Sequence, residues 1–171
     1  MSSSRNSARS GTRGYAHLVE IDAPPARVWR ALTDAALIRI WTGAEALVDA
    51  RQGGLYRVGR AGGRVVDAHI DIFDVNRRLR LIYMSEPRLP PCDSAIVDDF
   101  LLDVRKGPNT TSLRLLGSGI PENAAWDALY KKMRLGWERN MARMKVALEN
   151  PPRPKLAQPA FGDRPLPGLD T

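Results

Sequence analysis

The sequence is poor in the residues that make disulfides and metal sites. Its 171 residues include one cysteine and two histidines, so Cys92 has no partner for an internal disulfide and no nearby histidine in sequence to activate its thiol. We therefore interpret Cys92 as chemically passive. No HExxH, paired CxxC or EF-hand loop is present, and the glycines fall at turns. The sequence thus predicts neither a metal site nor a bound cofactor.

Long apolar runs are also missing. None approaches the roughly 18 residues that a membrane-spanning helix needs, and the opening MSSSRNSARSGTR lacks the apolar core of a signal peptide. These features predict a cytoplasmic protein without membrane insertion. The net charge is +7, but much of it lies at the two ends, and no dense basic stripe interleaved with aromatics is present. We therefore do not expect nucleic-acid binding.

What is present is one domain between two polar ends. Residues 1–13 are rich in Ser, Arg and Gly, and residues 151–171 are rich in Pro. Because neither segment has the hydrophobic periodicity that builds a core, both are predicted to be disordered. The domain itself is predicted to span residues 14–150.

The first third of the domain predicts a strand and two short helices. Residues 15–22 alternate loosely, which is typical of a strand, and the adjacent prolines Pro24 and Pro25 favour a helix start directly after it. Thr33 and Asp34 then interrupt the apolar helical spacing, and Asp34 can cap a second helix that runs to Trp41. We expect this helix pair to close the open end of a curved sheet, with Trp41 as its plug.

The rest of the domain predicts an antiparallel meander followed by a long helix. About six alternating segments lie between residues 44 and 116, separated by turns at residues 59–63, near Asn76 and at residues 106–109. In the third of these segments, alternation predicts a buried face made of Val66, Ala68, Ile70 and Ile72. Residues 122–149 carry apolar side chains every three or four positions, which predicts a helix of about seven turns lying across the sheet.

In this order the elements resemble the helix-grip fold of the START-like or SRPBCC superfamily, in particular the branch related to the activator of heat-shock-protein ATPase. The resemblance rests on IDAPPARVWRALTD with the tryptophan after it, GGLYRV, AHIDIFDVNRRLRLIY, LRLLGSGIPENA and GWERNMARMKVALE. It implies an α+β domain in which a curved antiparallel sheet of six to seven strands wraps a long C-terminal helix. The chain departs from the family pattern at Tyr83, where a tryptophan is usual, and at Gly117, where a histidine is frequent.

A long helix crossing a curved sheet leaves space between them, and this space is the expected ligand site. Alternation in the strands and the apolar stripe of the helix nominate eight lining residues, each of which could instead be ordinary core. They are Trp41, Tyr56, Tyr83, Phe100, Tyr130, Met133, Trp137 and Met141.

The two histidines are the candidates for acid–base chemistry. Alternation puts His69 on the face opposite Ile70, which predicts a solvated side chain, whereas the reverse register would bring it to the cavity as a weak catalytic candidate. His17 is either a polar group at the pocket mouth or a strand-end residue. The adjacent Asp98 and Asp99 point in opposite directions in a strand and cannot act as a carboxylate pair.

The sequence is compatible with three functions. The first is the binding of a small hydrophobic ligand, lipid or polyketide-like, between sheet and helix. The second is a cyclase or dehydratase acting on a bound polyketide-like substrate, and the third is a protein-interaction module like the co-chaperone branch. The expected partners are accordingly a small hydrophobic molecule or another protein, and the chain is expected to be a monomer or a homodimer.

Overall fold

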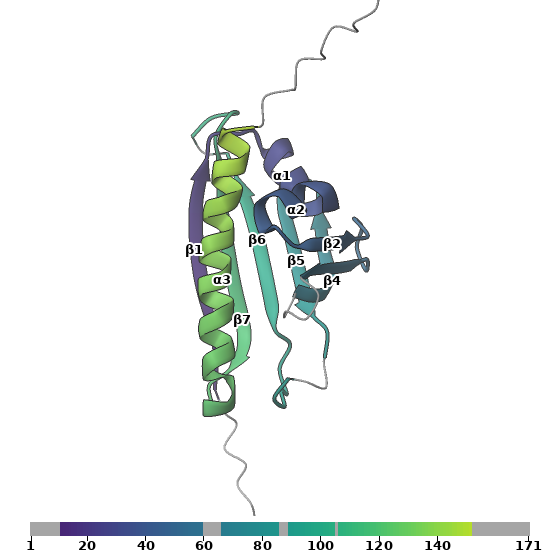
Figure 1. Cartoon of the computed structure of the whole chain (residues 1–171), viewed down its shortest axis with the longest axis vertical. Helices are drawn as coiled ribbons and strands as arrows, with labels where there is room; N and C mark the ends of the chain where they lie inside the picture. The colour runs from purple at the N-terminus through teal and green to yellow at the C-terminus, as the bar shows by residue number, and fades with distance from the viewer. Residues whose placement is uncertain (1–10, 60–65, 86–88, 105, 152–171) are drawn as a thin grey trace, which may run out of the picture.

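The computed structural model describes residues 11–59, 66–85, 89–104 and 106–151, and these form one antiparallel sheet with helices on a single face (Figure 1). Along the chain the elements are β1 (Thr12–Ile21), α1 (Pro25–Thr33), α2 (Ala35–Thr42), β2 (Glu45–Val48), β3 (Leu55–Gly59), β4 (Val66–Asp74), β5 (Arg78–Tyr83), β6 (Val97–Asp103), β7 (Thr111–Pro121) and α3 (Ala124–Glu149). The seven strands follow the order β1-β7-β6-β5-β4-β3-β2. The predicted helix-grip fold is confirmed.

The sheet is a simple meander except at one edge, where the first strand pairs with the last. Strand β1 runs antiparallel to β7, from Thr12 opposite Pro121 to Ile21 opposite Thr111. Helix α3 lies along β1 and β7 (Figure 1). Its fully buried side chains face the inner surface of the sheet, where Leu79, Leu81, Leu113 and Leu115 have no exposed area. This arrangement puts the core between α3 and the sheet.

The two short helices begin and end where the sequence predicts. Pro25 occupies the first turn of α1, and the Asp34 carboxylate accepts hydrogen bonds from the backbone N–H groups of Ala36 (2.9 Å) and Leu37 at the start of α2. Gly43, with φ of 65°, ends α2 in the left-handed region. The two helices therefore meet at a sharp corner that Asp34 stabilises.

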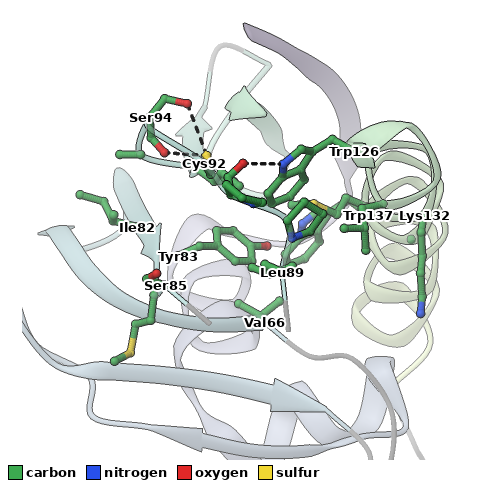
Figure 2. Close-up of a pocket in the computed structure, with 18 of the residues that line it drawn as sticks. Val66, Ile82, Tyr83, Ser85, Leu89, Cys92, Ser94, Trp126, Lys132 and Trp137 are labelled. Atoms are coloured by element: carbon green, nitrogen blue, oxygen red, sulfur yellow. Dashed lines mark hydrogen bonds between the residues drawn. The ribbon is translucent and has the colours of Figure 1, made fainter. Parts of the chain in front are cut away.

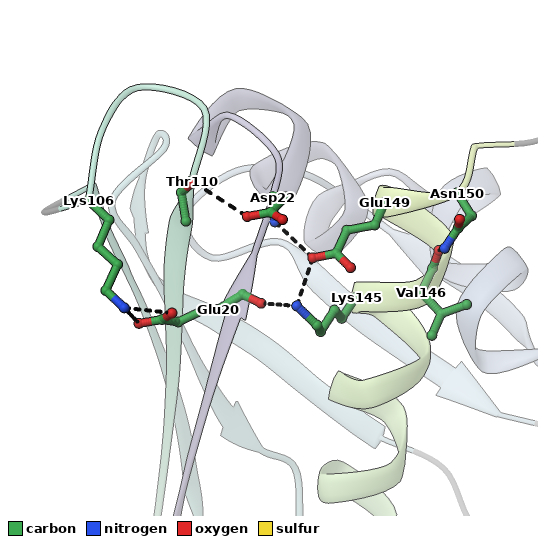
Figure 3. Close-up of polar contacts among 8 residues, drawn as sticks. All are labelled: Glu20, Asp22, Lys106, Thr110, Lys145, Val146, Glu149 and Asn150. Atoms are coloured by element: carbon green, nitrogen blue, oxygen red, sulfur yellow. Dashed lines mark hydrogen bonds and ion pairs between the residues drawn. The ribbon is translucent and has the colours of Figure 1, made fainter.

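The C-terminal end of α3 is fastened to the end of β1 (Figure 3). The Lys145 ammonium donates to the carbonyl of Glu20 at 2.6 Å, and the Glu149 carboxylate accepts from the backbone N–H of Asp22 at 2.9 Å. This backbone hydrogen bond, with Lys145 beside it, lowers the pKa of Glu149. Asn150 is the residue that caps the C-terminal end of the helix.

Strand β4 contains a bulge that the alternation pattern did not reveal. The pairing with β5 shifts between Ile70 and Ile72, so that Ile72 lies opposite Arg80 and Phe73 lies opposite the buried Leu79. Because the extra residue of a bulge reverses the direction of the side chains that follow, Phe73 instead of Ile72 faces the helices. Its ring packs edge-on against Trp29 at 5.1 Å. The predicted inward orientation of Ile72 was wrong.

Other boundaries differ by a few residues. Strand β1 takes in Thr12 and Arg13, which fall within the predicted N-terminal segment, and β7 continues to Pro121. The predicted turn at residues 59–63 lies largely outside the described residues, as do nearly all of the predicted terminal segments. Among the helices of the described ranges, none combines the length and the apolar character needed to cross a membrane.

Candidate functional site

A pocket of about 430 Å³ opens between α3 and the segment that joins β5 to β6 (Figure 2). Strand β6 begins only at Val97, and Leu89 to Ile96 form a loop that supplies one wall. The opposite wall comes from α3. Apolar side chains that line the pocket include Val66, Ile82, Leu89, Ile96, Trp126, Leu129 and Met133.

Two hydrogen bonds hold the loop wall in place. The Trp126 indole N–H donates to the carbonyl of Pro91 at 3.1 Å, which ties the loop to the first turn of α3 (Figure 2). The Ser94 hydroxyl donates to the carbonyl of Gly119 at 2.7 Å, which ties the same loop to β7. Cys92, interpreted from sequence as passive, is exposed at the pocket, and its Sγ lies 3.0 Å from the carbonyl oxygen of Ser94.

Gly136 leaves part of this space open. It lies in the middle of α3, where glycine is about 1 kcal/mol less favourable than alanine. A Cβ atom added there would meet no heavy atom within 4 Å, so close packing does not require a glycine. Because Gly136 lines the pocket, its missing side chain enlarges the pocket.

The inner wall of the pocket covers a buried carboxylate. Asp98 of β6 has no exposed area and accepts hydrogen bonds from the Tyr15 hydroxyl (2.5 Å), the Tyr83 hydroxyl (2.6 Å) and the Trp137 indole N–H (2.8 Å). Tyr83 and Trp137 both line the pocket, and Figure 2 shows Tyr83 reaching from β5 toward Trp137 of α3. We call these four residues the Asp98 cluster. It holds two rings of the pocket wall through a single oxygen, Oδ2 of Asp98.

Burial dominates the electrostatics of the cluster. The loss of water around Asp98 raises its pKa from 3.8 to about 6, although the three hydrogen bonds oppose the rise. Burial, and then the negative charge of Asp98, raise the pKa of both Tyr15 and Tyr83 well above its ordinary value. Both hydroxyls therefore stay protonated and act as donors. The neighbouring Asp99 points to the other side of β6 and pairs with Arg78 at 2.6 Å, as expected from the strand geometry.

Gly117 makes room for the cluster. A Cβ atom at this position would lie 2.4 Å from the ring of Tyr15, closer than any real contact. The Tyr15 ring, which reaches from β1 to Asp98, occupies the space that a side chain at position 117 would need. The departure from the pattern at Gly117 thus has a local steric reason.

Residues 22–149 match the family model of the Activator of Hsp90 ATPase homolog 1-like protein. The chain belongs to this family. The resemblance predicted from the sequence is confirmed, and the matched residues include α3 and the whole pocket wall that it supplies. No curated protein sequence matches this family member detectably.

Solved structures share the fold of this family member. Protein MLL2253 from Mesorhizobium loti is 24% identical with a TM-score of 0.68, and the match covers 80% of this chain and 97% of that one. The Aha1 dimer from Colwellia psychrerythraea is 20% identical with a TM-score of 0.68, and the match covers 80% of this chain and 96% of that one. DynU16, a putative protein in the dynemicin biosynthetic locus, is 21% identical with a TM-score of 0.64, and the match covers 80% of this chain and 47% of that one. At these identities the likeness extends to the fold.

The residues nominated from sequence fall into separate groups in this family member. Tyr83, Met133 and Trp137 come together at the pocket. Tyr56 and Phe100 are fully buried in the core, where the Tyr56 hydroxyl donates to the carbonyl of Leu32 at 2.8 Å. These two lie outside the pocket walls.

The other nominated residues also lie away from this pocket. Met141 is buried in the core, and the Tyr130 hydroxyl donates to the carbonyl of Gly14 at 2.9 Å. Trp41 is 4% exposed, donates from its indole N–H to the carbonyl of Ala31 at 2.9 Å, and borders a second, more open hollow of about 650 Å³ between α2 and α3. Its ring centroid lies 6.5 Å from that of Trp137. Trp41 thus closes the core beneath the second hollow.

Both histidines of the sequence lie in the described ranges, and neither lines either of the two hollows described above. His69 is exposed on the face away from α3, so the register that would make it a catalytic candidate is not the observed one. His17 is half-buried beside Tyr15, with ring centroids 5.6 Å apart. Within the described part of the chain, no three His, Cys, Asp or Glu side chains gather closely enough to bind a metal ion.

Proposed function

We propose that this protein binds a small, mostly apolar molecule, lipid or polyketide-like, in the pocket between α3 and the Leu89–Ile96 loop. The observation that carries the proposal is the pocket itself, about 430 Å³ with mainly apolar walls. Ligand pockets are typically hollows of roughly 300–1,000 Å³ with apolar walls and few polar groups. The cytoplasmic location predicted from sequence remains part of this proposal.

Two features of the walls support a binding role. Tyr83 and Trp137 are held by Asp98, and Trp126 holds the loop, so the rings that would contact a ligand are fixed before it arrives. A pocket that is already formed needs less ordering on binding, which favours affinity. Gly136 adds free volume at a position where a side chain could be accommodated.

The two alternatives have less support. A cyclase or dehydratase would require an acid–base group at the ligand, and neither histidine lines the pocket. A partner-binding role is suggested by two structural relatives, the Aha1 dimer and an HSP90 activator from Plasmodium falciparum, which share 20% and 19% of their residues with this chain. Partner binding and homodimer formation are the alternatives to which the test below is open.

Two position-136 variants test the proposal. Gly136→Phe should fill the pocket, whereas Gly136→Ala adds one methyl group, and both should preserve or raise helix stability because glycine is replaced. Binding of the neutral dye Nile red is followed by its emission, and native mass spectrometry looks for a copurified small molecule. We expect Gly136→Phe to lose binding and Gly136→Ala to keep it, with no loss of melting temperature. A wild-type protein that binds no dye and carries no small molecule would overturn the proposal and favour partner binding.

A further inference from the structure

The rim of the pocket is positively charged. Among the described residues, the charged side chains that line it are those of Lys132 and Arg139, and no Asp or Glu lines it. Both are exposed, and neither has an ion-pair partner among the described residues, although several surface pairs occur elsewhere on the sheet and helices. Two unpaired cations at the mouth of an apolar cavity cost little in water, but they attract an anion that approaches the same mouth.

The two cations can act on one group. They are seven positions apart on α3, about 10 Å along the helix axis, and therefore share a face. Figure 2 shows Lys132 at the edge of the pocket, its ammonium extended away from the rings of Tyr83 and Trp137. Both side chains are long and flexible enough to turn toward a group at the mouth. Asn140, which also lines the pocket, adds an amide donor on the same side.

The inner end of the pocket has the opposite character. The hydroxyl of Tyr83 and the indole N–H of Trp137 both donate to Asp98, so these donors are not available to a ligand. Asp98 lies behind the two rings and carries a negative charge when ionised. An anionic group would therefore be repelled at the inner end and attracted at the rim.

From this polarity we infer that the ligand is an amphiphilic carboxylic acid, with its apolar body against Tyr83 and Trp137 and its carboxylate at Lys132 and Arg139. The inference rests on the proposed function and adds the chemical class and the orientation of the ligand. Since surface cations are partly screened, their contribution to the binding affinity is modest, and it decreases with ionic strength.

Decanoate and decanol, which share a chain length and differ in charge, test the inference by displacement of Nile red at about pH 8, where the acid is ionised. Decanoate should bind roughly tenfold more tightly than decanol, a preference that high salt reduces. The double variant Lys132→Ala/Arg139→Ala should lose this preference and keep its affinity for decanol. Lys131→Ala/Arg134→Ala, two cations of α3 that do not line the pocket, is the control for net charge and should keep the preference.

The outcomes separate the two proposals. If both compounds displace the dye equally well from the wild type, or if the control variant loses the preference as well, the carboxylate inference is overturned and the apolar pocket stands. If neither compound nor the dye binds, the proposed function is overturned together with the inference. Native mass spectrometry gives an independent readout, because a copurified neutral molecule would also contradict the carboxylate.

Discussion

Replacing Asp98 with asparagine should change how the stability of the protein depends on pH. The amide has the shape of the carboxylic acid and is uncharged at every pH. Its oxygen can accept from Tyr83 and Trp137, as Oδ2 of Asp98 does, while its NH₂ group faces the Tyr15 hydroxyl, which can rotate to accept. Asp98→Asn therefore keeps the packing of the cluster and removes the charge.

The magnitude follows from the raised pKa of Asp98, about 6 in the folded protein against an ordinary value of 3.8. Between these values the folded state binds more protons than the unfolded state, so the free energy of unfolding decreases as pH rises. The decrease begins near pH 4 and is complete above about pH 6, where it amounts to about 3 kcal/mol. Asparagine contributes no such decrease. The stability of Asp98→Asn relative to the wild type should therefore increase by about 3 kcal/mol across this range.

Urea denaturation at several values between about pH 4 and pH 7, followed by tryptophan fluorescence, measures this difference directly. Asp99→Asn, the same substitution one residue away on the other side of β6, controls for the change in net charge. A difference between Asp98→Asn and wild type that stays constant over the pH range would refute the reasoning. It would mean that burial does not raise the pKa of Asp98 above its ordinary value.

Two further predictions concern packing. Trp41→Ala should reduce the free energy of unfolding by about 3–5 kcal/mol, because a buried ring and its hydrogen bond to Ala31 are lost; a loss below about 1 kcal/mol in urea denaturation would contradict a core role. Gly117→Ala should cost about 1–3 kcal/mol, because its Cβ would overlap the Tyr15 ring at 2.4 Å. In Gly117→Ala the displaced Tyr15 hydroxyl should also leave Asp98, which a changed pH dependence of stability would reveal, and unaltered stability and pH dependence would count against the contact.

The fold could be predicted because each of its elements carries a local signal. Pro25 and Asp34 mark the starts of two helices through backbone chemistry that needs no distant partner. The apolar stripe of α3 must be buried against a broad surface, and the sheet provides it. The bulge after Ile70 carried no such signal, because alternating apolar residues continue through it and only the pairing with β5 displaces Ile72.

The site was less predictable because it depends on distant contacts. The sequence predicts that Phe100 faces inward, and because side chains alternate along a strand, Asp98, two residues earlier, shares its face. This alternation alone predicts that the Asp98 side chain is buried. The three donors that satisfy it come from β1, β5 and α3, whose meeting point is set by strand order and not by local spacing. The sequence also does not reveal the loop wall of the pocket, because its apolar and proline residues resemble those of strands and turns.

The pairing of β1 with β7 has a consequence for synthesis of the chain. Ile21 leaves the ribosome 90 positions before Thr111, the residue opposite it in the sheet. At about 5–20 residues per second, β1 remains without its partner strand for roughly 5–20 seconds. During that time its unpaired backbone is an open edge that any other extended segment can join. The first strand of the domain is thus among the last to be paired. Until β7 has been synthesised, the nascent chain carries an exposed strand edge that can associate with other chains.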